Sequence, residues 1–358
     1  MTGVETLTDR ERVGGDSSGQ SVPAGDGDEG AMERAGDGER RGLTAVVAEG
    51  GGQRGIYTAG VLDALGGERI FPFDLGIGVS AGAQNLLAFF LDRPGYARRA
   101  IEKLTAAPGF YVPYRWFTHR NVIDLDGYFE HILTDPEHHL EYPRLGDIVP
   151  RRRLLFVATC RDTLEPCYLE PTATDAVECM KASSAVPLLY RSGVRLRDRC
   201  LMDGGVADPL PVVRARHEGA GRILVIRTGN GDVSGLLASV QRLRRTRAMP
   251  AGLLRMIECH EAASREARAF LAAPPPDVRV LEISPSQPLL SQVFGSHSRS
   301  LVHDYAIGFE DGLAHAPALR GWGDPAMGSG ALTVPPAAVP AAVPAPAGRT
   351  ADASPRPE

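Results

Sequence analysis

Three short glycine-rich motifs, each directly after a short apolar run, constrain this 358-residue chain more than any other feature. They are Gly50-Gly51-Gly52-Gln53-Arg54-Gly55, Gly78-Val79-Ser80-Ala81-Gly82 and Asp203-Gly204-Gly205. A strand that runs into a glycine-rich turn is typical of α/β proteins, in which ligands bind beyond the carboxyl ends of the strands. We therefore expect the three motifs to meet at one edge of a sheet, although more than a hundred residues separate the second from the third.

Apolar runs and amphipathic stretches alternate from residue 43 to residue 314. Strands are expected at 43–48, 73–79, 154–159, 200–202, 223–227 and 278–283. Helices are expected at 55–65, 81–91, 175–183, 248–271 and 297–314. Continuously apolar strands between helices are typical of a parallel sheet buried on both faces. The predicted fold class is therefore α/β with three layers, a mainly parallel central sheet with helices on both faces.

Composition divides the chain into a globular middle and two ends of different character. Residues 1–42 are rich in glycine and charged residues and lack the apolar core of a secretory signal, whereas residues 322–358 are rich in alanine and proline. Both compositions are typical of disordered segments. We expect one folded domain at 43–321, in which 43–229 carries the motifs and 230–321 is mainly helical.

The formal net charge of −5 arises from the two ends, because residues 43–321 hold 31 acidic and 32 basic residues. Charge therefore argues neither for nor against an anionic substrate, and we expect no nucleic-acid partner. The five cysteines form no C-x-x-C pair and have no metal-ligand spacing with histidine, so we expect no metal ion. No apolar stretch approaches the ~18 residues of a membrane-spanning helix, and we expect a cytoplasmic protein.

Ser80 lies at the centre of the G-x-S-x-G motif, between a predicted strand and a predicted helix. A strained turn at this point would expose its hydroxyl group, and glycines at positions 78 and 82 would let neighbouring backbone pass closely. The helix that begins near Ala81 would point its positive end at the same place. A serine that only caps the helix is the alternative, but the strand–turn–helix context favours a nucleophile.

The glycine run at 50–52 can present several backbone N–H groups to an anion. An oxyanion hole uses such donors. Gly50, Gly52 and Gly55 also satisfy the G-x-G-x-x-G pattern of a dinucleotide loop, whereas the G-K-[ST] ending of a phosphate-binding loop is missing. Arg54 either braces the loop through backbone carbonyl groups, the interpretation that we favour, or contacts a substrate phosphate.

Asp203 follows a predicted strand and opens a Gly-Gly turn. It is either an ordinary turn residue or a general base that takes the Ser80 proton without a histidine between them. A Ser-His-Asp triad on an α/β-hydrolase fold is a further alternative. In the chain order of that fold, the histidine would follow the acid and would be His217, His260, His297 or His303.

Together and in this order, the three motifs resemble those of the patatin-like phospholipases, a family of lipid acyl hydrolases with a Ser–Asp dyad. The segment Ala182-Ser183-Ser184-Ala185-Val186-Pro187 also resembles a block that packs near the site in this family. The similarity spans residues 43–227. Gln84 departs from the apolar residue that members often carry after the serine, but it does not touch the dyad.

The resemblance implies that Ser80 is the nucleophile and Asp203 the base, and that phospholipids or lysophospholipids are cleaved through an acyl-serine intermediate without a metal or cofactor. The implied oxyanion donors are Gly50, Gly51, Gly52 and Ala81. The implied supporting residues are Gln53, Arg54, Gly55, Gly78, Gly82, Gly204 and Gly205. Two other classes stay open: a regulatory or scaffold protein on the same fold with negligible turnover, and a nucleotide-binding module.

Two segments suggest weak peripheral contact with the inner face of a membrane, whereas protein partners stay unknown from the sequence. The basic run at 242–247 either touches an anionic bilayer or forms a solvated helix face. The aromatic residues Tyr114, Trp116 and Phe117 either meet the membrane interface, line an acyl pocket or belong to the core.

Overall fold

The computed structural model describes residues 42–148, 152–229 and 250–323. The ends expected to be disordered therefore lie outside the described residues, apart from Gly42, Trp322 and Gly323, and so does the basic run at 242–247.

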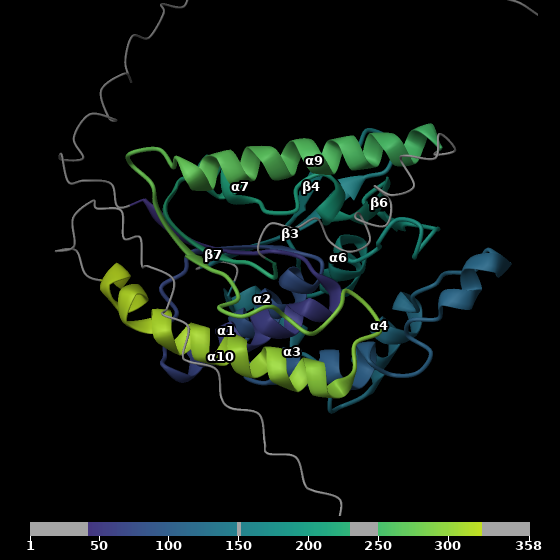
Figure 1. Ribbon diagram of the computed structural model, residues 1–358, viewed down its shortest axis with the longest axis horizontal. Coiled ribbons are helices and arrows are strands. Elements are labelled where there is room, and N and C mark those ends of the chain that lie inside the picture. The colour runs from purple at the N-terminus through teal and green to yellow at the C-terminus, as the bar shows by residue number, and fades with distance from the viewer. Residues whose placement is uncertain (1–41, 149–151, 230–249, 324–358) are drawn as a thin grey trace, which may run out of the picture. The chain divides into compact units, whose positions relative to one another are not determined.

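Within the described part, eight strands form one sheet in the order β5-β6-β3-β2-β1-β7-β8, with β4 pairing with β3 (Figure 1). Five neighbouring strands, from β3 to β8 in this order, run parallel, whereas β4, β5 and β6 are added in antiparallel pairs. The strands are β1 Leu43–Ala48, β2 Leu75–Val79, β3 Arg153–Cys160, β4 Pro166–Leu169, β5 Val194–Leu196, β6 Arg199–Asp203, β7 Ala220–Ile226 and β8 Arg279–Ile283. The prediction of an α/β fold with a mainly parallel sheet is confirmed.

Helices cover both faces of this sheet, so the three-layer prediction is also confirmed (Figure 1). One layer holds α1 (Gly55–Gly67), α2 (Ala81–Phe90) and α10 (Ser298–Arg320), and the other holds α7 (Val212–His217) and α9 (Ala251–Ala272). The remaining α-helices of the described residues are α3 Tyr96–Arg99, α4 Leu125–Thr134, α5 Leu145–Ile148 and α6 Ala176–Ser183.

The continuous apolar character of the central strands follows from burial on both faces. In β1, Val46 and Ala48 belong to the core beneath α1 and α2, whereas Ala45 and Val47 belong to the core beneath α7 and α9. All four side chains are fully buried. Neither face of such a strand can carry a polar side chain at low cost, which is why the strand reads as an unbroken apolar run.

The structure extends the folded part further than the sequence indicated. We expected the last helix to end at residue 314 and a disordered segment to begin at 322, but α10 continues through Pro317 to Arg320. The continuation buries Leu319 and Trp322, and Arg222 donates a 2.8 Å hydrogen bond to the Trp322 carbonyl oxygen. The helix runs past its predicted end at residue 314 because burial of these apolar side chains outweighs the helix-breaking tendency of Pro317.

The C-terminal helix α10 packs closely along α1 through small residues. A Cβ atom added at Gly308 would lie 2.1 Å from the carbonyl oxygen of Tyr57, and one added at Gly60 would lie 2.3 Å from the carbonyl oxygen of Tyr305. The Tyr57 hydroxyl donates a 2.9 Å hydrogen bond to Asp311 in the same interface. The helix that follows the first glycine motif is therefore held in place by the last helix of the fold.

We expect Gly308→Ala to lower the free energy of unfolding by about 3 kcal/mol, because the added methyl group must push the two backbones apart. Gly67→Ala in α1 is the matched control, since nothing lies within 4 Å of a Cβ atom there, and it should be neutral or slightly stabilising. Urea denaturation of both variants measures the difference. Equal stability of the two variants would contradict the close packing of α10 on α1.

Candidate active site

Ser80 occupies a strained turn between β2 and α2. Its backbone has φ 53° and ψ −121°, in the left-handed region that residues other than glycine rarely adopt. A Cβ atom at Gly78 would lie 2.5 Å from Ala83 Cα, and one at Gly82 would lie 2.4 Å from the Ala48 carbonyl oxygen. Only glycine fits at these two positions, so the motif spacing follows from the sharpness of the turn.

The 182–187 segment packs against this turn and fixes it. The Ser80 N–H group donates a 2.9 Å hydrogen bond to the Ser183 hydroxyl, which in turn donates a 2.6 Å bond to the Val157 carbonyl oxygen. Gln84 donates to the Ser184 hydroxyl at 3.0 Å and accepts from the Tyr128 hydroxyl at 2.6 Å. The polar residue at position 84 is therefore satisfied by hydrogen bonds.

Asp203 is held against the same turn by its own backbone and by the glycines that follow it. Its N–H group donates to the Ala185 carbonyl oxygen, and its carbonyl oxygen accepts from the Thr159 hydroxyl, both at 2.9 Å. The Asp203 carboxylate accepts a 2.7 Å bond from the Gly205 N–H group. A Cβ atom at Gly204 would lie 2.2 Å from the Val157 carbonyl oxygen, so this turn also requires glycine.

Burial raises the pKa of Asp203 to about 6, whereas hydrogen bonds from the Gly205 N–H group and the Ser80 hydroxyl act to lower it. The Ser80 hydroxyl lines the same cavity as this carboxylate and acts to lower its pKa. Both side chains are mostly buried, at 8% and 7% exposed. At neutral pH the carboxylate is ionised in most molecules and is a much stronger base than an exposed aspartate.

The three motifs meet at one edge of the sheet, but one part of the expected reason is wrong. We expected the motifs to meet because each follows a strand of a mainly parallel sheet, yet β6 runs antiparallel to β3. Its register pairs Asp203 with Ala158, one residue beyond Val157, which pairs with Val79 in β2. Because β6 begins beyond the sheet edge and runs back towards it, its last residue still lies beside Ser80.

The first glycine motif is fixed by the C-terminal part of the chain. Gly52 has φ +57°, and a Cβ atom there would lie 2.3 Å from the Val293 carbonyl oxygen. The Gln53 N–H group donates to that same oxygen at 2.9 Å, and the Gln53 side chain accepts from the Ser296 N–H group at 2.7 Å. The loop conformation therefore depends on residues beyond the motif-bearing part of the chain.

Several backbone donors of this loop are left without an acceptor. Among residues 42–148, 152–229 and 250–323, no group accepts a hydrogen bond from the N–H groups at 50, 51 or 52. These three glycines and Ala81 line the same cavity as Ser80 and Asp203. The arrangement can stabilise negative charge next to the Ser80 hydroxyl.

Arg54 also lines this cavity and forms no bracing hydrogen bond to a backbone carbonyl group of a described residue through its side chain. Its Nε atom is buried without a partner in the described part of the chain, and its guanidinium group lies against Gly229. Burial raises the pKa of the neighbouring Glu49, whereas Arg227 and the Thr228 N–H group act to lower it. Arg54 and Arg227 therefore lie beside the glycine loop together with Glu49, which forms an ion pair with Arg227.

The cavity itself has a volume of about 280 Å³ and mainly apolar walls. One wall comes from the connection between β2 and β3 and includes Phe110, Ile123 and Leu125. The opposite wall comes from α9 and includes Met256 and Ile257. The sequence indicated no role for α9, because its residues carry no motif.

Histidines do not complete a triad with Asp203 in the described part of the chain. His260 on α9 lines the cavity, but its Nδ1 atom lies 2.5 Å from the Gly205 carbonyl oxygen, and burial lowers its pKa. His303 contacts Asp304, and His297 precedes α10. His260 therefore supports the turn that holds Asp203, and the triad alternative finds no support in the geometry.

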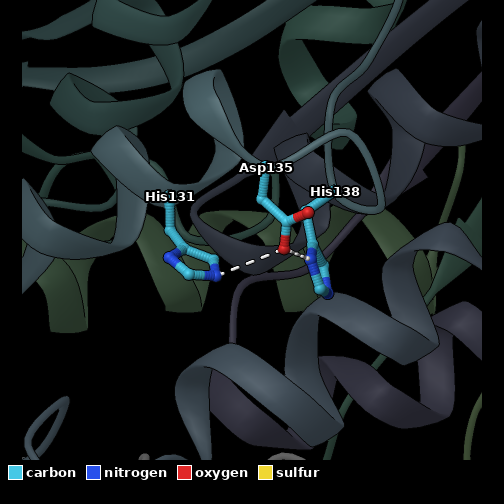
Figure 2. A group of neighbouring side chains, drawn as sticks. All are labelled: His131, Asp135 and His138. Atoms are coloured by element: carbon cyan, nitrogen blue, oxygen red, sulfur yellow. Dashed lines mark hydrogen bonds and ion pairs between the residues drawn. The ribbon is translucent and has the colours of Figure 1, made fainter.

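The described residues that could hold a metal ion lie away from this cavity, at the end of α4. His131, Asp135 and His138 offer ligand atoms within 4.8 Å of one another (Figure 2). The Asp135 carboxylate lies between the two imidazole rings, 3.3 Å from His131 Nε2 and 2.9 Å from His138 Nδ1. The two contacts of Asp135 tie the turn after α4 to the helix, whereas His138 Nε2 is buried without a partner among the described residues.

Comparison with known proteins assigns a family to this fold and site. Residues 46–216 match the patatin-like phospholipase family, and residues 251–323 match a domain of unknown function, DUF6363. The uncharacterized protein YjjU of Escherichia coli (strain K12) is 38% identical over 272 residues, which are 75% of each chain.

Solved structures with partial similarity include VipD from Legionella pneumophila, with 12% identity and a TM-score of 0.38. That match covers 77% of this chain and 67% of VipD. Human GIVD cytosolic phospholipase A2 has 11% identity and a TM-score of 0.41, and the match covers 79% of this chain and 59% of the human chain.

The chain belongs to the patatin-like phospholipase family, as its motifs indicated. Membership of this family supports lipid acyl hydrolase activity. Among the described residues, no helix is long and apolar enough to cross a membrane.

Proposed function

We propose that this protein is a serine hydrolase that cleaves carboxyl esters of phospholipids or lysophospholipids. The observation that carries the proposal is the meeting of three features in one apolar cavity. They are the Ser80 hydroxyl on a strained turn, the buried Asp203 carboxylate that lines the same cavity, and a loop whose N–H groups have no acceptor among the described residues. Nucleophile, base and oxyanion donors are the parts that acyl transfer needs.

In the proposed reaction, the Ser80 oxygen attacks the ester carbonyl carbon while its proton passes to Asp203. Negative charge develops on the carbonyl oxygen and is stabilised by N–H groups of Gly50, Gly51, Gly52 and Ala81. The intermediate collapses when the ester C–O bond breaks and the leaving alcohol takes the proton from Asp203. A water molecule then attacks acyl-Ser80 and gives a proton to Asp203, which returns it to the serine as the fatty acid leaves. No step needs a metal ion or cofactor.

The walls of the cavity support a lipid as the substrate. Apolar side chains from the β2–β3 connection and from α9 suit an acyl chain, because burying them against it removes apolar surface from water. Arg54 supplies a charge at the loop end, and we assign it to the phosphate of the head group. The motif-bearing part and α9 form one catalytic unit in this proposal.

The pH profile of hydrolysis tests this function. A protonated Asp203 cannot accept the serine proton, so kcat/KM should fall about tenfold per pH unit below the Asp203 pKa of about 6 and level off above it. Fatty-acid release from micellar phospholipid and hydrolysis of a monodisperse short-chain ester should both follow this profile. If the protein hydrolyses neither substrate at any pH, a regulatory or scaffold role replaces the proposal.

A further inference from the structure

A two-stranded segment, residues 110–124, extends the cavity wall into an exposed tip. The Val112 N–H group donates to the Val122 carbonyl oxygen, and the Asp124 N–H group donates to the Phe110 carbonyl oxygen, both at 2.8 Å. The 3-10 helix Pro113–Thr118 forms the tip between these strands. We call residues 110–124 the aromatic hairpin.

The tip exposes three aromatic side chains. Tyr114 is 69% exposed, Trp116 43% and Phe117 83%, so the interpretation that they belong to the core is wrong. They also do not line the cavity. Exposing large aromatic rings to water costs free energy, and a cluster of exposed rings is typical of a surface that binds another molecule or a membrane.

Positive charge surrounds these rings. The Arg191 guanidinium lies over the Trp116 ring at 4.8 Å from its centre, and Arg191 also bonds the Trp116 carbonyl oxygen at 3.3 Å. Arg120 is exposed at the end of the tip. On the hairpin itself, the acidic side chain is Asp124, and Arg115 faces it at 3.9 Å. Aromatic rings interleaved with arginine match the interface of an anionic bilayer, where the rings enter the head-group layer and the charges meet lipid phosphates.

The base of the hairpin joins the surface to the cavity. Phe110 and Ile123 lie side by side at this base and both line the cavity, as does Leu188 of the segment that the hairpin pairs with through Leu189. Tyr111 packs on Phe294, another cavity residue, with ring centres 5.5 Å apart. Apolar side chains therefore continue from the exposed tip to the wall of the cavity that Ser80 also lines.

We propose that the aromatic hairpin anchors the protein on anionic bilayers. The anchored hairpin places the apolar cavity wall at Phe110 and Ile123 next to the lipid. This proposal rests on the lipid hydrolase function for its substrate, but binding to a bilayer can be measured without turnover. The hairpin then shortens the path of an acyl chain from the bilayer to Ser80, since the same strands that carry the anchor form the cavity wall.

The test uses the full chain with Ser80→Ala, so that no lipid is consumed, and vesicles of phosphatidylcholine alone or mixed with phosphatidylglycerol. Sedimentation should show binding to the mixed vesicles that weakens with added salt. Changing Tyr114, Trp116 and Phe117 together to serine should weaken vesicle binding at least about tenfold. Arg120→Glu alone should weaken it by less. Leu313→Ser, which alters a 40% exposed side chain on α10, is the matched control and should bind normally.

Fluorescence gives an independent signal, because the chain has two tryptophans and Trp322 is only 3% exposed. Emission should shift to shorter wavelength on mixed vesicles and should not shift in Trp116→Phe, which keeps an aromatic ring and should still sediment with vesicles. Unchanged binding of the triple variant, or no shift from Trp116, would overturn the proposal and leave the tip as a surface for a protein. If vesicles bind but wild type hydrolyses no ester, the anchor stands and the hydrolase function fails.

Discussion

Ser80→Ala is expected to lower kcat/KM for both the monodisperse ester and micellar phospholipid by about 10⁴-fold or more, because the acyl-enzyme can no longer form. The effect should fall on kcat rather than on KM, since the cavity walls that hold the substrate are unchanged. The removed hydroxyl group acts on the pKa of Asp203 and holds no other described residue in place, so the fold should survive. Initial-rate kinetics with a far-ultraviolet spectrum of each variant measure both points.

Ser184→Ala is the matched control for this change. Ser184 is also mostly buried and lines the same cavity, but its hydroxyl contacts Gln84 rather than Asp203. The loss of one such hydrogen bond should change kcat/KM by less than about tenfold. A Ser80→Ala variant that remains folded and keeps wild-type activity would mean that another group attacks the ester.

Asp203→Asn should lower kcat by about 10³- to 10⁴-fold while making the fold more stable at neutral pH. Burial holds the folded-state pKa of Asp203 near 6, above its ordinary value of 3.8, so the unfolded chain releases this proton at lower pH than the folded chain does. The free energy of unfolding therefore falls as pH rises from 3.8 to about 6, and the cost is fully present above that range. Removing the ionisation should restore up to about 3 kcal/mol at pH 8.

Asp208→Asn separates the predicted gain in stability from the predicted loss of activity. Burial also raises the pKa of Asp208 to about 6, but its carboxylate contacts the Tyr168 hydroxyl rather than Ser80. This variant should gain stability as Asp203→Asn does and keep its activity. Urea denaturation at pH 8 and at pH 4 measures the change in the free energy of unfolding for both variants. The gain in stability should be present at pH 8 and should disappear at pH 4. A loss of stability at pH 8 in Asp203→Asn would contradict the raised pKa.

The sequence was sufficient to predict the strand–turn–helix around Ser80, because its geometry is local. The glycines at 78 and 82 are required by backbone atoms only a few residues or one strand away, and the motif records that requirement. The same holds for the burial of β1 on both faces, which its apolar run indicates directly. Steric requirements between residues close in the chain can therefore be predicted from the sequence.

The direction of β6 could not be predicted in this way. A strand of five residues has the same composition whether it runs parallel or antiparallel, and its pairing with β3 depends on contacts far along the chain. The placement of Asp203 beside Ser80 was expected on a wrong premise about that direction. Register, rather than strand polarity, brings the carboxylate to the site.

The contacts by which the C-terminal part holds the glycine loop and the Asp203 turn could not be predicted from the sequence either. Val293 and Ser296 hold the glycine loop through backbone groups, which any residue can supply. His260 contacts the Asp203 turn through a single bond from the middle of a long helix. Only the Gly308 and Gly312 spacing on α10 could have indicated close packing, because small residues four apart mark one face of a helix.

Covalent labelling of Ser80 tests the central claim most directly. A long-chain alkyl fluorophosphonate should modify the full-length protein once per chain, and peptide mapping by mass spectrometry should place the adduct on Ser80. Hydrolysis of phospholipid should fall in proportion to the labelled fraction, and Ser80→Ala should take up no label. An adduct on another residue that abolishes activity, or full hydrolysis after complete labelling of Ser80, would contradict the account.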